Sequence, residues 1–154
     1  MSQAIPFSRN AGAARARHGK AMLLPIARRT ADELALRVHL SLDALRRGAG
    51  GIGDAQALTQ TMLLTGFLAE CGFGEANGEQ LATAERVVSM VFDIGRETGE
   101  WKLDDGGFEV FAAIATNYDQ QLHSAPLWAI TEASDRLDRF TAGMPYQAPM
   151  RKRA

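Results

Sequence analysis

The chain has 154 residues, of which 46% are hydrophobic and 23% are charged, and its formal net charge is −1. This composition is typical of one globular domain, long enough to fold without a disulfide or a metal ion. The lone cysteine, Cys71, excludes an internal disulfide framework. No apolar run approaches the roughly 20 residues of a membrane span, and the N-terminus lacks a secretory signal, so we expect a cytoplasmic protein.

The charges are separated along the chain. Residues 1–29 and 142–154 hold nine basic residues and no acidic one, whereas all 18 acidic residues lie between them with the other 8 basic residues. The sequence therefore predicts an acidic body of net charge −10 and two basic, largely flexible arms. The arm cations are candidate phosphate ligands: Arg9, Arg15, Arg17, Lys20, Arg28, Arg29, Arg151, Lys152 and Arg153. The alternative is that both arms only keep the protein soluble.

Helical periodicity begins at Thr30, which with Glu33 has the spacing of a capping box. Two apolar stripes follow and predict a first helix that is covered on two sides. The first stripe consists of Leu34, Val38, Leu42 and Leu45, and the second consists of Leu36 and Leu40. Arg46 and Arg47 suit the negative end of this helix, and glycines end it.

The second helix is expected over residues 54–71 and is apolar nearly all round. Such a helix is either central in a bundle or part of a subunit interface. A homodimer through helix 54–71 is therefore one option. Gly66 lies inside this helix, where a glycine costs about 1 kcal/mol relative to alanine, and so marks a close helix approach.

Three more helices are expected, each with one apolar face. Asn77 caps the third, Asp104 caps the fourth, and the fifth begins near Ser124 with Pro126 in its first turn. The inward residues are Leu81, Ala84, Val88, Val91 and Gly95, then Phe108, Phe111, Ala115, Tyr118 and Leu122, then Leu127, Ile130, Ser134 and Leu137. Short connections predict that consecutive helices are antiparallel neighbours.

The fold expected is all-α, because no strand-like alternation of useful length occurs. We expect a compact bundle of about five helices over residues 30–143, with a basic arm over residues 1–29 and a basic tail over residues 144–154.

Residues with catalytic chemistry do not form a recognisable motif. Asp119 and His123 are four apart and could reach one ligand, but His123 is better interpreted as a partner of the last carbonyl groups of its helix. Cys71 is interpreted as structural. We expect no cofactor, no metal site and no enzymatic activity. Trp101 and Trp128 are candidate partner-binding residues; the alternative is that both pack on neighbouring helices.

A resemblance to a known group of proteins is carried by Leu42–Gly48 (LDALRRG) and Leu63–Gly74 (LLTGFLAECGFG). The chain resembles small all-helical accessory proteins of proteobacterial prophages and other mobile elements, which are often labelled Fis-like regulators. That group includes both accessory regulators and inhibitors of host defence, so the resemblance by itself implies neither role.

Two functional hypotheses follow. The first is a nucleic-acid-associated accessory or regulatory protein whose arms contact phosphates and whose helical body binds a partner. The second is an inhibitor or adaptor whose acidic body binds a basic protein, such as part of a host-defence complex. A helix-turn-helix around Gly72–Gly74 is disfavoured, because the helix that follows carries Glu79, Glu85, Asp93 and Glu97.

Overall fold

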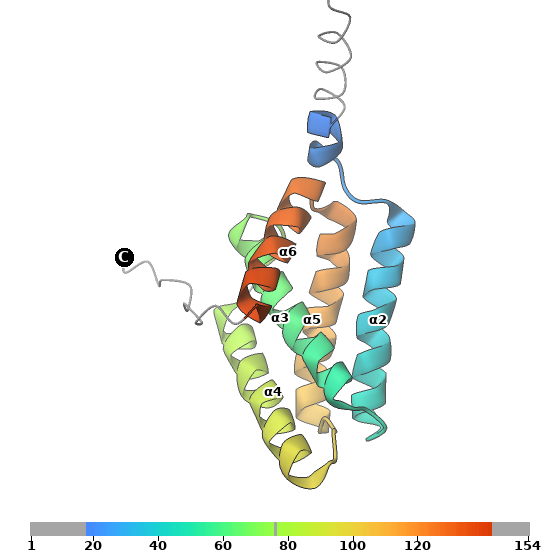
Figure 1. The fold of residues 1–154 in the computed structure, drawn as a ribbon, viewed down its shortest axis with the longest axis vertical. Helices are drawn as coiled ribbons and strands as arrows, with labels where there is room; N and C mark the ends of the chain where they lie inside the picture. Colours follow the sequence, from blue (N-terminus) through green and yellow to red (C-terminus); the bar gives the residue numbers. More distant parts are fainter. Residues whose placement is uncertain (1–17, 76, 143–154) are drawn as a thin grey trace, which may run out of the picture.

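A computed structural model describes residues 18–75 and 77–142 of the chain. Five long helices make up most of this part: α2 (Arg28–Arg46), α3 (Ile52–Glu70), α4 (Gly78–Thr98), α5 (Asp105–Ser124) and α6 (Leu127–Thr141). A short helix over residues 18–23 precedes them and projects beyond the end of the bundle (Figure 1). The predicted all-α bundle is confirmed. No helix within the two described ranges is long and apolar enough to cross a bilayer.

Helix α3 lies at the centre of the bundle and packs against α2, α4, α5 and α6. Its fully buried side chains recur every three or four residues and form one stripe: Ala55, Leu58, Thr61, Met62, Thr65 and Leu68. The apolar side chains of Leu63, Leu64 and Phe67 lie on its other sides and are half-buried. Of the two predicted positions for this helix, the structure therefore shows the central one. The apolar sides of α3 pack largely on helices of the same chain. The apolar character of this helix therefore gives no reason to expect a homodimer.

Helices α2 and α5 lie side by side and form one half of the core (Figure 1). Their predicted stripes are buried at Val38, Leu42 and Leu45, and at Phe111, Tyr118 and Leu122. The expectation that consecutive helices are always neighbours is wrong for α6, which packs mainly on α3 rather than along α5.

The inward face of α6 also differs from the prediction. Its buried residues are Ala129 and Ala133, while the expected Leu127, Ile130, Ser134 and Leu137 are only half-buried. Small alanine side chains allow the α6 backbone to approach α3 closely, and this requirement outweighs the larger apolar residues nearby. The helix begins one residue after Pro126, which is its N-cap residue.

The first long helix begins two residues before Thr30. Helix α2 begins at Arg28 after Ala27, no side chain caps it, and Thr30 lies within its first turn, so the predicted capping box at Thr30 is wrong. The preceding segment is tied to the bundle, because the Leu127 N–H donates to the Leu24 carbonyl at 2.8 Å. This backbone contact and the packing of Ile26 on the core show that residues before Thr30 also belong to the packed body.

The second stripe of α2 is not covered. Leu36 and Leu40 are 55% and 59% exposed, contrary to the expected coverage on two sides. The two helices that pack on α2, which are α3 and α5, lie on its opposite side, where Ala31, Ala35 and Val38 are buried.

The predicted caps of α4 and α5 are confirmed. Asn77 Oδ1 accepts from the Glu79 N–H at 2.9 Å, and Asp104 Oδ1 accepts from the Gly107 N–H at 2.6 Å. These bonds satisfy N–H groups that a helix leaves without a partner at its start. The connection before α4 is held as well, because the buried Gln121 side chain donates from Nε2 to the Phe73 carbonyl at 2.9 Å.

The close approach assigned to Gly66 occurs instead at Gly95. A Cβ atom on Gly66 would lie 3.5 Å from a Leu81 methyl group, an ordinary contact. A Cβ atom on Gly95 would lie 2.5 Å from the indole ring of Trp101. Gly95 therefore makes the space in which Trp101 packs against α4.

Replacing Gly95 by alanine is therefore expected to destabilise the protein. The new methyl group must displace the indole, which costs about 1–3 kcal/mol of unfolding free energy. Gly66→Ala is the matched control and should be neutral or stabilising by up to about 1 kcal/mol, because alanine favours the helix. Urea unfolding followed by circular dichroism measures both. Equal effects of the two substitutions would contradict the assignment of the close approach to Gly95.

Candidate protein-binding groove

The predicted phosphate ligands fall into two groups. Lys20, Arg28 and Arg29 lie in the described part of the chain and are exposed. Arg29 is paired with Glu33 at 3.3 Å, one turn along α2, with 92% of its side chain exposed. The other six lie outside the described residues: Arg9, Arg15, Arg17, Arg151, Lys152 and Arg153.

The two predicted partner-binding tryptophans are half-buried and pack within the bundle. Trp101 makes an edge-on contact with Phe92, with ring centroids 5.6 Å apart. Trp128 makes a similar contact with Phe73, also at 5.6 Å. The alternative interpretation, packing on neighbouring elements, therefore accounts for both residues.

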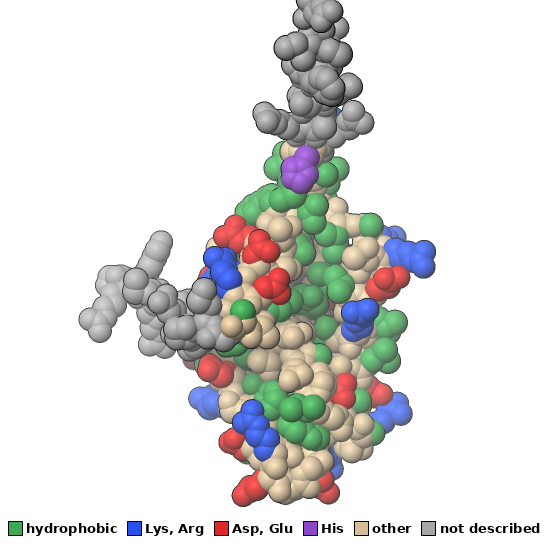
Figure 2. All heavy atoms as spheres, in the orientation of Figure 1, with side chains coloured by type: hydrophobic (Ala, Val, Ile, Leu, Met, Phe, Trp, Pro, Cys, Tyr) green, Lys and Arg blue, Asp and Glu red, His purple; other side chains and the backbone are tan. Residues whose placement is uncertain are grey.

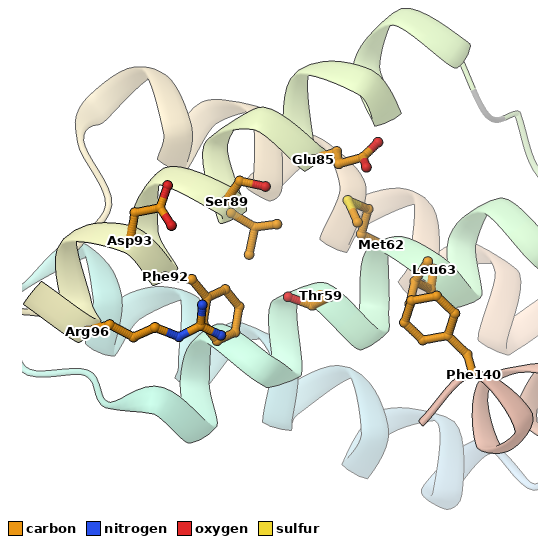
Figure 3. A pocket seen from close by; sticks show the side chains of 10 residues that line it. Thr59, Met62, Leu63, Glu85, Ser89, Phe92, Asp93, Arg96 and Phe140 are labelled. Carbon is orange, nitrogen blue, oxygen red and sulfur yellow. The ribbon is translucent and has the colours of Figure 1, made fainter. Parts of the chain in front are cut away.

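Described residues of α3, α4 and α6 line a groove between α3 and α4. Its volume is about 390 Å³. Three residues of α3, six of α4 and one of α6 line it: Thr59, Met62, Leu63, Glu85, Val88, Ser89, Phe92, Asp93, Arg96 and Phe140. Figure 3 shows the α4 side chains along one wall and the α3 side chains along the other.

The floor of the groove is apolar and continuous with the core. Met62 and Val88 are buried, whereas Leu63 and Phe92 are half-buried. Phe92 is held in place, because its ring contacts Trp101 on one side and the Arg96 guanidinium lies 5.3 Å from its centroid. The groove therefore rests on side chains that the core already fixes.

The groove exists because α6 does not continue along α4. Ala129 and Ala133 seat α6 on α3, and α6 then reaches the groove only at Phe140 (Figure 1). The strip of α3 that includes Thr59 and Leu63 is left beside α4 without a covering helix.

Two carboxylates stand at the rim of the groove. Glu85 and Asp93 are exposed, two turns apart on α4, and no cation of the described residues lies within salt-bridge distance of either. Over the face seen in Figure 2, acidic and basic side chains are interspersed, with hydrophobic side chains exposed between them. The lining therefore holds two carboxylates and one cation, Arg96, and this excess of one negative charge favours a cationic ligand at the Glu85 and Asp93 side chains.

The side chains of Cys71, Tyr118 and His123 do not line the groove. Burial and the negative charge of Glu132 raise the pKa of the Cys71 thiol, which therefore stays protonated at neutral pH. Burial likewise raises the pKa of Tyr118. Among the described residues, no group of three or more His, Cys, Asp or Glu side chains is placed to hold a metal ion.

His123 joins the N-terminal end of α2 to the C-terminal end of α5. Its Nδ1 lies 2.7 Å from the Asp119 carbonyl oxygen, a contact that the sequence predicts. Its Nε2 lies 2.8 Å from Asp32 Oδ1, a contact that the sequence does not predict. Both neighbours are acceptors, so both ring nitrogens donate only when the imidazole is protonated. The hydrogen bonds to the Asp119 backbone and then to Asp32 raise the pKa of His123.

Comparison of the chain with family models, with curated proteins and with solved structures gives no match.

The raised pKa of His123 predicts a pH-dependent stability. Its contribution is fully present below the ordinary pKa of 6.5 and is lost as the pH rises through the raised value. We expect wild-type protein to exceed His123→Gln in urea midpoint at about pH 5.5, with a difference that shrinks by about pH 8.5. His39→Gln, an exposed change on α2, is the control. A difference that grows with pH would contradict this role.

Proposed function

We propose that the protein is a non-catalytic binding protein whose acidic helical body holds a basic, partly apolar segment of another protein in the groove between α3 and α4. The observation that carries this proposal is the apolar floor of Met62, Val88 and Phe92, open to the surface beneath the carboxylates of Glu85 and Asp93. Apolar burial supplies affinity, and charge complementarity supplies selectivity and a faster association.

The dimensions of the groove set the kind of segment that fits. The lining residues of α4 run from Glu85 to Arg96, about 16 Å along the helix axis. This length accommodates about three turns of an amphipathic helix or about five residues of extended chain. One face of such a segment would rest on the floor, and its Lys or Arg side chains would reach Glu85 and Asp93.

The charge of the whole body supports the same partner class. Residues 30–141 contain 18 acidic and 8 basic residues, so their net charge of −10 attracts a basic protein at long range. An inhibitor of a nucleic-acid-binding complex is one form that such a protein takes, because an acidic surface competes with nucleic acid for the same cations.

A second candidate function is nucleic-acid association through the basic arms. Lys20 on the projecting helix and Arg28 at the start of α2 are exposed, and neither makes an ion pair with a described residue. The helical body opposes such binding, because the acidic residues of α4 would repel phosphates. Contacts would therefore be confined to the arms and would position the protein on the nucleic acid without reading its sequence.

The groove proposal predicts selective peptide binding. We expect the protein to bind a fluorescein-labelled amphipathic helix of leucine and lysine, about 15 residues long, with micromolar affinity in fluorescence anisotropy. A matched peptide with glutamate in place of lysine should bind at least about tenfold more weakly.

Two substitutions locate that binding. Ser89→Arg adds bulk and positive charge inside the groove and should weaken the lysine peptide by about tenfold or more, a change of 1.4 kcal/mol. Thr116→Arg, at an exposed hydroxyl residue of α5 outside the groove, should leave the affinity unchanged. Equal weakening by both substitutions, or equal binding of both peptides, would overturn the groove proposal.

The arm hypothesis predicts a reduced salt dependence of DNA binding. Each cation that contacts a phosphate contributes about 0.9 to the slope of log K against log salt concentration. Lys20→Gln with Arg28→Gln should therefore lower the slope by about 2, measured by anisotropy on a labelled duplex. Lys102→Gln, in the connection between α4 and α5, is the control. An unchanged slope would exclude these two residues as phosphate ligands.

A further inference from the structure

We propose that the groove between α3 and α4 is occupied by the chain's own residues 143–154, which a basic protein segment must displace. This inference rests on the proposed function and deepens it, because it adds a regulatory step to the same groove. Three observations lead to it: the place where α6 ends, the length of the groove, and the side-chain pattern of residues 143–154.

Helix α6 delivers the chain to the rim of the groove. It ends at Thr141, and Phe140 is itself one of the lining residues, with its ring drawn beside Leu63 at one end of the groove (Figure 3). Residue 143 follows within two positions of the end of this helix. No long connection is needed for the following segment to enter the groove.

The following segment is long enough to run the length of the groove. Residues 143–154 are 12 residues, which reach about 40 Å when extended. The groove wall on α4 extends about 16 Å from Glu85 to Arg96. About half of the segment would therefore fill the groove and leave the remaining residues for its rim.

The sequence of the segment matches an apolar floor with an acidic rim. Pro145 and Pro149 restrict both themselves and the residues before them to extended backbone. Alternate residues of an extended chain share a side, and here one side is apolar. That side consists of Met144, Tyr146, Ala148 and Met150.

The charges of the two surfaces also match. Three cations, Arg151–Arg153, follow the apolar residues, and the segment contains no acidic residue. The rim offers Glu85 and Asp93, which make no ion pair with a described residue. The segment thus belongs to the basic, partly apolar class that the groove favours. Because it is tethered, its effective concentration is of the order of millimolar, enough to compete with a partner segment.

A photo-crosslink in the full chain tests the occupancy. With benzoylphenylalanine in place of Tyr146, we expect crosslinks within one chain onto the lining residues of α3 and α4, with a yield independent of protein concentration. Ser89→Arg should abolish these crosslinks, and Thr116→Arg should leave them. The absence of intramolecular crosslinks, their location on α2 or α5, or their formation only between two chains would overturn the inference.

A binding measurement distinguishes this inference from the proposed function. In the full chain, Met144→Asp with Met150→Asp should release the segment and raise the affinity for the leucine–lysine peptide by about threefold or more. Equal peptide binding with and without these changes would overturn the inference and leave the proposed function standing. If the peptide binds neither the wild-type chain nor the doubly substituted chain, the proposed function is wrong. The crosslinks from position 146 would still decide whether residues 143–154 occupy the groove.

Discussion

The packing of α3 against all four other long helices is the constraint on which the rest of the structure depends. This helix is apolar nearly all round, so each neighbour must cover one side of it. Helices α2 and α5 cover one side as a pair, α4 covers another, and α6 lies across a third (Figure 1). The bundle is therefore organised around one central helix, and the position of the groove follows from how completely that helix is covered.

Helix α3 is covered incompletely because the residues through which α6 packs on it are small. Ala129 and Ala133 bring α6 close to α3, and Arg136 fixes it there by pairing with Glu70 at 2.6 Å and lying 4.1 Å from the Phe67 ring centroid. This placement directs α6 over one part of α3 and away from α4. The exposed strip beside α4 is thus a consequence of close packing elsewhere, and its floor is as well fixed as the core to which it belongs.

The helices and their main faces could be predicted from the sequence, because they depend on local periodicity. The caps at Asn77 and Asp104 and the buried stripe of α5 are cases in which local chemistry decides the structure. The exposure of Leu36 and Leu40 and the deep burial of Ala129 and Ala133 could not be predicted in this way. They depend on which side of each helix meets a neighbour, and a single helix does not encode that choice.

The candidate site was missed for the same reason. Val88 belongs to the core stripe of α4, while Phe92 and Ser89 lie beside it on a flank that periodicity leaves undefined. The signal that could have found them is a half-apolar flank that carries two carboxylates, Glu85 and Asp93, next to a core stripe. The pair His123 and Asp32 likewise joins residues 91 positions apart, which only the tertiary structure brings together.

The central claim is that the strip between α3 and α4 is the binding surface of the body. Backbone amide chemical shifts of the ¹⁵N-labelled full chain, recorded during titration with the leucine–lysine peptide, test it most directly. We predict that the shifts that change are those of the α3 and α4 residues around Met62, Ser89 and Phe92, together with those of residues 143–154 as they leave the groove. Changes confined to the outer faces of α2 and α5, with no response from α4, would contradict the account.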